Sequence, residues 1–310
     1  MKLSLLIAGF VLMLVHKTLF TFSEEIQVNL FLIGVLLIGV PHGAADLLVA
    51  SRNAITQKKK FSTLNFLFVY IGRLLIFALL LWYSLLFGIF IFILFAAYHF
   101  GETDLFKFNT SKITGKLFVI SYGLLILGSI LLNNYEEVVI LLSKFNLSEK
   151  DATLISWIGS NKTHLLTGII LSFFSSSFIH FSIENEDVGN KGLFIIELII
   201  ILLIISYLPM ILGFTFYFIV WHSTISLSNI LGYLNRERTI RIGSIVKEML
   251  LYSSIAIVGT CLVGFFGFMY TDGNSLIVYT FLALAVLTAP HMQIMHEMYC
   301  EIRKVNKAFT

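Results

Sequence analysis

Residues 64–82 read LNFLFVYIGRLLIFALLLW, an apolar run in which Arg73 is the one charged residue. A helix needs about 20 mostly apolar residues to cross the hydrocarbon core of a bilayer. The next run, residues 84–101, reads SLLFGIFIFILFAAYHFG and carries no Asp, Glu, Lys or Arg. Two such runs in direct succession predict a pair of antiparallel membrane-spanning helices.

The rest of the chain repeats this pattern. Of the 310 residues, 58% are hydrophobic and 13% are charged, which leaves too few polar side chains to cover a water-soluble domain. The sequence therefore predicts an all-α, polytopic transmembrane bundle of about ten spans, forming one integral-membrane domain over residues 1–310. A net charge of +3, spread over loops, gives no reason to expect a nucleic-acid partner. The other expected spans are 3–22, 30–50, 117–133, 164–183, 193–208, 210–232, 249–270 and 275–300.

Basic residues predict the orientation of these spans, because loops rich in Lys and Arg stay in the cytoplasm. With a cytoplasmic N-terminus, Lys2 and the inside segments hold 16 of the 21 basic residues. One inside segment, residues 184–187, is acidic and fits this arrangement least well. The longest break, 134–163, mixes charged and apolar residues and predicts an amphipathic helix on the membrane surface. The inside segments are 51–63, 102–116, 184–192, 233–248 and the tail after 300.

Four histidines fall on spans that all run from outside to inside in this topology. Each lies 8 to 14 residues before the next basic residue, so at 1.5 Å per residue their depths differ by only about 9 Å. Imidazoles in one layer of a bundle can converge on a transition metal such as iron, copper or zinc. Two further histidines, His16 and His164, lie at expected outer span ends, where an interfacial place is expected. The four are His42, His99, His222 and His291.

Carboxylates accompany these histidines. Asp46 follows His42 by four residues, on the same helical face, and Asp104 follows His99 by five. A carboxylate that accepts the second ring N–H of a ligand histidine fixes its tautomer and orientation. We therefore expect Asp46 and Asp104 to orient metal-bound imidazoles, although Asp104 could equally mark the end of its span.

Residues alone do not separate two classes of membrane protein. A proton- or ion-coupled transporter could use His42, Asp46, His99 and His222 as a relay of intramembrane polar groups. Inverted repeats would favour such a transporter, and the sequence has no evident repeat. A b-type haem carrier is disfavoured, because it normally needs histidine pairs, and the spans that carry these three histidines have one histidine each.

Four local motifs resemble those of the bacterial Brp/Blh family of membrane-embedded β-carotene dioxygenases. They occur in the family's order and extend over most of the chain. The resemblance implies a multi-pass protein of the bacterial cell membrane that cleaves β-carotene with O2 at its central double bond into two molecules of all-trans-retinal. The motifs are Pro41-His42-Gly43-Ala44-Ala45-Asp46, Tyr98-His99-Phe100-Gly101-Glu102-Thr103-Asp104, Trp221-His222-Ser223 and Pro290-His291-Met292.

The resemblance also implies Fe(2+) as the cofactor, with His42, His99 and His222 at family ligand positions. The family often carries another histidine four residues after the one that matches His222, and Ser226 stands there in this chain. His291 is the first candidate to replace that ligand and His296 is the alternative. Membrane lipid is the expected surrounding, and a retinal-binding protein is a candidate recipient of the product.

Overall fold

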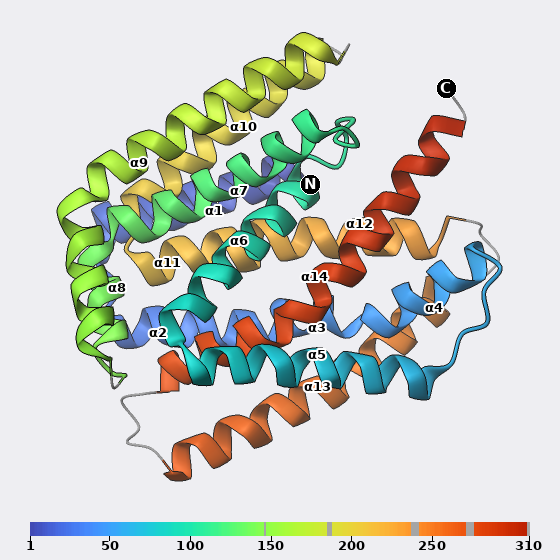
Figure 1. The fold of residues 1–310 in the computed structure, drawn as a ribbon, viewed down its shortest axis with the longest axis horizontal. Helices are drawn as coiled ribbons and strands as arrows, with labels where there is room; N and C mark the ends of the chain where they lie inside the picture. Colours follow the sequence, from blue (N-terminus) through green and yellow to red (C-terminus); the bar gives the residue numbers. More distant parts are fainter. Residues whose placement is uncertain (146, 185–187, 237–241, 271–275, 309–310) are drawn as a thin grey trace. The chain divides into compact units, whose positions relative to one another are not determined.

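The computed structural model describes residues 1–310 except 146, 185–187, 237–241, 271–275 and 309–310. The described residues form helices and connecting turns and contain no strand, which confirms the predicted all-α membrane bundle (Figure 1). Internal contacts divide the chain into two units. Unit 1 comprises Met1–Val35 and Phe100–Ser223, and unit 2 comprises Leu36–His99 and Thr224–Thr310. The single domain predicted for residues 1–310 therefore stays a prediction.

Unit 1 is built on the packing of two long helices, α7 (Ile113–Asn133) and α9 (Glu149–Ile183). The buried face of α7 is aromatic and apolar, and Phe118 and Ile130 are fully enclosed. Gly101 allows close packing here, because a Cβ at this position would lie 2.0 Å from the carbonyl oxygen of Val119. The other elements of this unit are α1 (Lys2–Leu14), η1 (Val15–Leu19), α2 (Glu24–Gly34), α8 (Tyr135–Leu142), α10 (Val188–Tyr207), α11 (Met210–Phe214) and η3 (Thr215–Ser223).

Unit 2 is organised around α14 (Leu276–Ala308), which packs against α4 (Asp46–Thr56) and α5 (Thr63–Tyr83). The helix α6 (Leu85–Asp104) contributes to both units, because the division falls between His99 and Phe100. The segment η2 (Val35–Gly39) begins with the last residue of the first part of unit 1, and the rest of it belongs to unit 2. The remaining elements of unit 2 are α3 (Val40–Ala44), α12 (Thr224–Leu234) and α13 (Ile242–Tyr270).

Seven described segments are long and apolar enough to cross a membrane. They match seven of the expected spans, so the polytopic character is confirmed. Helices α10, α13 and α14 cover the three other expected spans, and the count of ten stays a prediction. The seven are Lys2–Leu19, Glu24–Thr56, Thr63–Tyr83, Leu85–Asp104, Ile113–Asn133, Glu149–Ile183 and Met210–Leu234.

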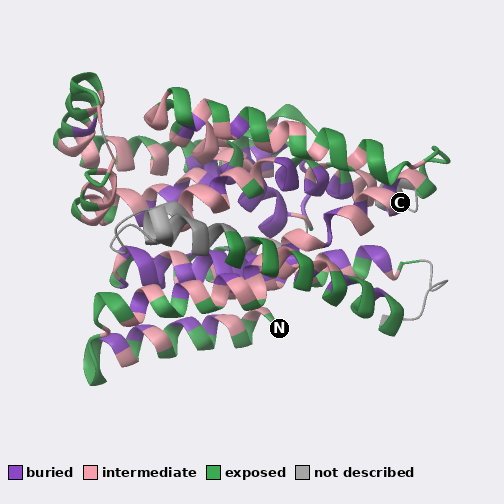
Figure 2. Cartoon of the chain, turned by 90° about the horizontal axis from the view of Figure 1, so that it is seen from below, coloured by how far each residue is buried: buried purple, intermediate pink, exposed green. Residues whose placement is uncertain are grey.

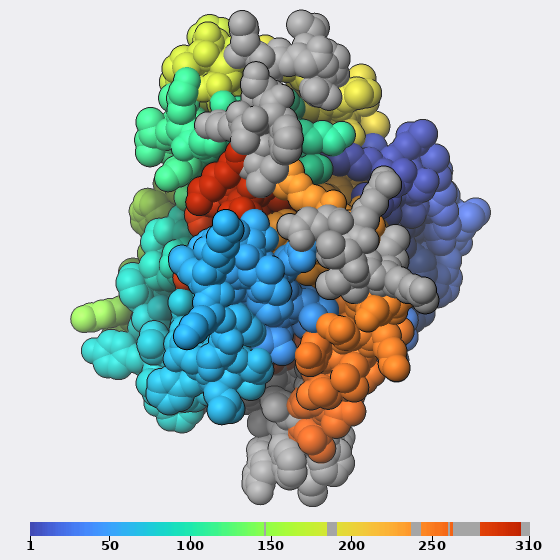
Figure 3. Space-filling view, turned by 90° about the vertical axis from the view of Figure 1, so that its right-hand side faces the viewer, coloured from blue at the N-terminus to red at the C-terminus, as the bar shows by residue number. Residues whose placement is uncertain are grey.

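Helix α5 shows the surface expected for contact with lipid. Along one face, Leu64, Phe68 and Trp82 are 80–90% exposed, and Leu75 and Leu79 continue the same face. Such a continuous apolar face would be unfavourable in water and is normal against hydrocarbon. Helices α4 and α5, blue to cyan in Figure 3, form part of the visible surface, and buried and exposed positions alternate along the helices in Figure 2.

The prediction of one surface helix over 134–163 is wrong. The first part forms the short helix α8, and the residues from Glu149 onward belong to α9, which continues to Ile183 as one 35-residue helix. Ser148 begins α9 with a capping box in which Ser148 and Asp151 bond to each other's backbone N–H. This cap explains why the helix begins here, ahead of the apolar run that marks the span.

Two loops that the charge pattern places on the same side of the membrane lie together in unit 1. Glu184, at the end of α9, accepts hydrogen bonds from Asn109 at 2.9 Å and from Lys112 at 2.8 Å. The hydrogen bond from Lys112 lowers the pKa of the Glu184 carboxyl. The acidic start of the 184–187 segment is thus partly neutralised by a basic loop. Residues 185–187 of this segment lie outside the described residues.

Candidate metal centre

Unit 2 brings three of the four predicted histidines together from three different helices. His42 lies on α3, His99 on α6 and His291 on α14, and they form what we call the three-histidine cluster. The ring centroids of His42 and His291 are 4.8 Å apart, and those of His99 and His291 are 5.2 Å apart. All three side chains are at least 96% buried. Residues separated by up to 249 positions in the chain therefore form one compact group.

The carboxylate of Asp46 holds His291 in this cluster. Asp46 Oδ1 lies 2.7 Å from His291 Nδ1, and both side chains are almost fully buried. A carboxylate oxygen can only accept, so Nδ1 donates, and in the neutral imidazole the second ring nitrogen, Nε2, keeps its lone pair. Sequence spacing associates Asp46 with His42, whereas in the structure this carboxylate bonds to His291, 245 residues away.

Tyr70 also contributes to this site, although no sequence motif indicated it. Its hydroxyl, on α5, donates to the second oxygen of Asp46, Oδ2, at 3.0 Å. The available signal was weak: a tyrosine in the middle of a span needs a partner for its hydroxyl, because lipid offers none. Nothing in the sequence indicates that this partner is Asp46.

The side chains of the cluster offer the donor chemistry of a first-row transition-metal site. His291 Nε2 is buried and has no hydrogen-bond partner among the described residues, a costly state that a bound ion would relieve. Imidazoles that share an ion through metal–nitrogen bonds of about 2 Å have ring centroids roughly 4.5–5.2 Å apart. The two separations in the cluster agree with this range. Neutral imidazole donors suit iron, zinc, copper and nickel.

The backbone around His42 departs from regular α-helix. Directly before α3, which contains Pro41, the chain passes through the π-helical segment η2. A proline has no N–H and its ring clashes with the carbonyl four residues earlier, here that of Leu37. The wider π turn relieves this clash and changes the direction of the side chains that follow, as π segments often do at functional sites.

His222, the fourth predicted ligand, lies in unit 1 on η3, another π-helical segment. It is completely buried, and its ring packs on Phe100 at 4.4 Å and stacks on Phe218 at 6.2 Å. Ser226, at the position where the family often has another histidine, belongs to unit 2. It is fully buried, and its hydroxyl has no hydrogen-bond partner among the described residues.

Asp104 was expected to orient an imidazole, but the structure gives it other hydrogen-bond partners. In unit 1 its Oδ2 accepts hydrogen bonds from the Tyr122 hydroxyl at 2.7 Å, the Tyr217 hydroxyl at 3.0 Å and the Trp221 indole N–H at 3.0 Å. Within the described part of the chain, none of its hydrogen bonds comes from a histidine. Because Trp221 immediately precedes His222, the carboxylate anchors the helix that carries this histidine and does not contact its ring.

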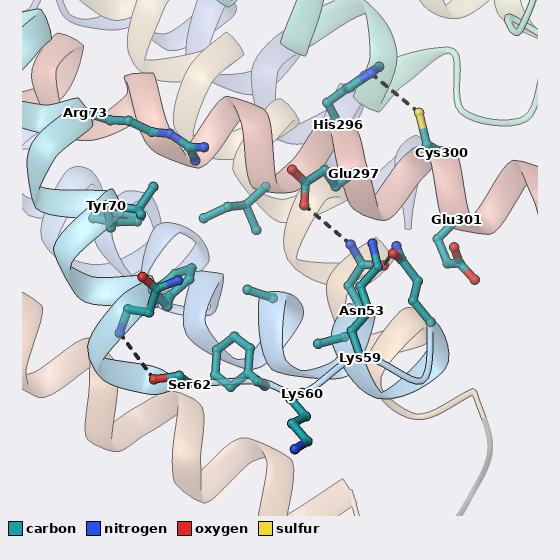
Figure 4. A pocket seen from close by; sticks show the side chains of 18 of the residues that line it. Asn53, Lys59, Lys60, Ser62, Tyr70, Arg73, His296, Glu297, Cys300 and Glu301 are labelled. Carbon is teal, nitrogen blue, oxygen red and sulfur yellow. Dashed lines mark hydrogen bonds between the residues drawn. The ribbon is translucent and has the colours of Figure 1, made fainter.

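The alternative fourth ligand, His296, lies apart from the three-histidine cluster. Its ring is 5.7 Å from that of Tyr98, and its Nε2 is 3.5 Å from the Cys300 sulfur. It lines a cavity of unit 2 near Arg73 and Glu297 (Figure 4). His180 packs in unit 1, stacked on Phe118 at 5.0 Å. The choice between His291 and His296 as a metal ligand stays a prediction.

Comparison with protein-family models gives a match to the model described as β-carotene 15,15'-dioxygenase, over residues 33–299. Searches of curated proteins and of solved structures find no match. The matched region contains the three-histidine cluster, Asp46, Tyr70, Asp104 and His222, and it covers most of the chain. The chain therefore belongs to the β-carotene 15,15'-dioxygenase family.

Proposed function

We propose that the protein is an iron-dependent dioxygenase that cleaves β-carotene at its central double bond into two molecules of all-trans-retinal. The observation that carries the proposal is the convergence of His42, His99 and His291 within a chain of this family. Cleavage adds one oxygen atom of O2 to each carbon of the broken bond. The reaction balances without a further oxidant, reductant or proton donor.

Each residue of the site has a defined task in this proposal. His42, His99 and His291 supply neutral nitrogen donors, and His222 is proposed as a further ligand from its family motif. Bound Fe(2+) would supply the activation of O2. Asp46 keeps His291 in the tautomer that presents Nε2, since its oxygen accepts the hydrogen bond from Nδ1–H. The uncharged imidazoles of these four histidines would still leave open coordination positions, which oxygen chemistry requires.

The membrane setting matches the proposed substrate. β-Carotene is a long hydrocarbon that dissolves in lipid and not in water. A site held within apolar helices of a membrane bundle can receive this substrate directly from the bilayer. Burial of all three histidine rings also keeps bulk water from the reacting atoms.

We expect retinal to accumulate when the full chain is expressed in a β-carotene-producing bacterium. The cells should lose their orange colour, and chromatography should show retinal in place of carotene. Shortened aldehydes other than retinal would show that the enzyme cleaves a different double bond of the carotenoid. Full retention of carotene, with the protein confirmed in the membrane fraction, would contradict the proposal and favour the transporter alternative.

A further inference from the structure

Unit 2 contains a cavity of about 540 Å³, lined by α4, α5, α14 and the segment between α4 and α5. Its wall includes polar side chains, among them Asn53, Arg73 and Glu297 (Figure 4). Tyr70 also lines this cavity, and its hydroxyl donates to Asp46. Tyr70 thus belongs to the cavity wall and to the group of residues that holds His291.

Hydrogen bonds join Tyr70, Asp46 and His291 in series. Tyr70 bonds to Oδ2 of Asp46 at 3.0 Å, and Oδ1 of the same carboxylate bonds to Nδ1 of His291 at 2.7 Å. With each oxygen engaged, the carboxylate cannot rotate about its own axis without breaking a bond. A buried carboxylate that lost one of its two partners would be less well stabilised and less well oriented.

We propose that Tyr70 is a positioning residue that acts through Asp46 to fix the Nε2 atom of His291 as a metal donor. The inference rests on the proposed function and extends it to a residue outside the family motifs quoted above. Tyr70 has no direct contact with the metal in this assignment. Its effect on metal affinity must therefore be transmitted entirely by Asp46.

The alternative is that the Tyr70 ring only fills the wall of the cavity. Replacement of Tyr70 by phenylalanine separates these roles, because it keeps the ring and removes the hydroxyl. If the ring alone matters, Tyr70→Phe should bind metal like the wild type. If the hydroxyl orients Asp46, affinity should fall although the fold is unchanged.

The experiment is a titration of the metal-free, detergent-purified full chain with Co(II), whose visible absorption reports its coordination. We expect Tyr70→Phe to lower Co(II) affinity about tenfold, the lower end of the range for residues that support metal ligands. Asp46→Asn should lower it by as much or more. The double variant should bind within about twofold of Asp46→Asn, because two residues that act through one path are not additive.

Tyr135→Phe is the matched control. Tyr135 donates its hydroxyl to the Ile155 carbonyl at 2.7 Å in unit 1, so this variant also loses one hydrogen bond, and wild-type affinity is expected. Wild-type affinity in Tyr70→Phe, or a double variant whose loss equals the product of the two single losses, would overturn the inference. A wild-type chain that binds no Co(II) would instead overturn the proposed metal site itself.

Discussion

Replacement of His291 by alanine should abolish retinal formation and remove most of the bound iron. The substitution removes a nitrogen that would bind the metal, and it leaves Asp46 without the N–H group that now donates a hydrogen bond to it. The loss should exceed about 100-fold, the upper end of the range for residues that only support metal ligands. His42→Ala, His99→Ala and His222→Ala should have the same effect. Activity and iron content are measured on protein purified from membranes.

His296→Ala provides the decisive comparison, because it removes a histidine of the same helix that lies apart from the three-histidine cluster. It should keep iron and measurable turnover. His164→Ala, at an exposed position of α9, should be silent. Loss of iron in His296→Ala together with its retention in His291→Ala would reverse the ligand assignment. Wild-type iron content in His42→Ala and His99→Ala would contradict the metal site altogether.

Asp104→Ala should destabilise the protein more than other single substitutions of polar residues in unit 1. The change leaves the hydroxyls of Tyr122 and Tyr217 and the indole N–H of Trp221 buried without their acceptor. Each unsatisfied buried donor costs about 1–3 kcal/mol, so a total loss of several kcal/mol is expected. The midpoint of thermal unfolding in detergent, followed by circular dichroism, measures the effect.

Two variants calibrate this result. Asp104→Asn keeps a carbonyl oxygen that can accept hydrogen bonds and should lose less stability than Asp104→Ala. Tyr122→Phe removes one of the three donors and should cost about 1 kcal/mol. If Asp104→Ala unfolded at the wild-type temperature, the three hydrogen bonds would not stabilise the protein as described.

The apolar runs predict the bundle well, because length and composition are sufficient to identify a membrane span. Seven described helices match expected spans. The charged segment 134–163 was misassigned because its Ser148 cap starts a helix that continues directly into the next span. Charge content alone does not show whether a polar segment lies on the membrane or extends the helix beyond it.

The site is less predictable, since it depends on how each helix is rotated about its axis. The expected depth along the spans places His42, His99 and His291 in one layer, and the structure brings their rings together. His291 and His296 leave α14 on different sides, because five residues turn an α-helix by about 140° beyond one full turn. The pairing of Asp46 with His291, and the part of Tyr70, depend on contacts between distant segments that no local spacing encodes.

X-ray absorption at the iron edge of the purified, active chain identifies the atoms that bind the iron. We predict iron surrounded by imidazole nitrogens at about 2.0–2.2 Å, with no sulfur ligand and no porphyrin signal. The imidazole contribution should disappear when His42, His99 and His291 are replaced together. Retinal formation by a chain that holds no iron, or an unchanged iron spectrum in this triple variant, would contradict the account.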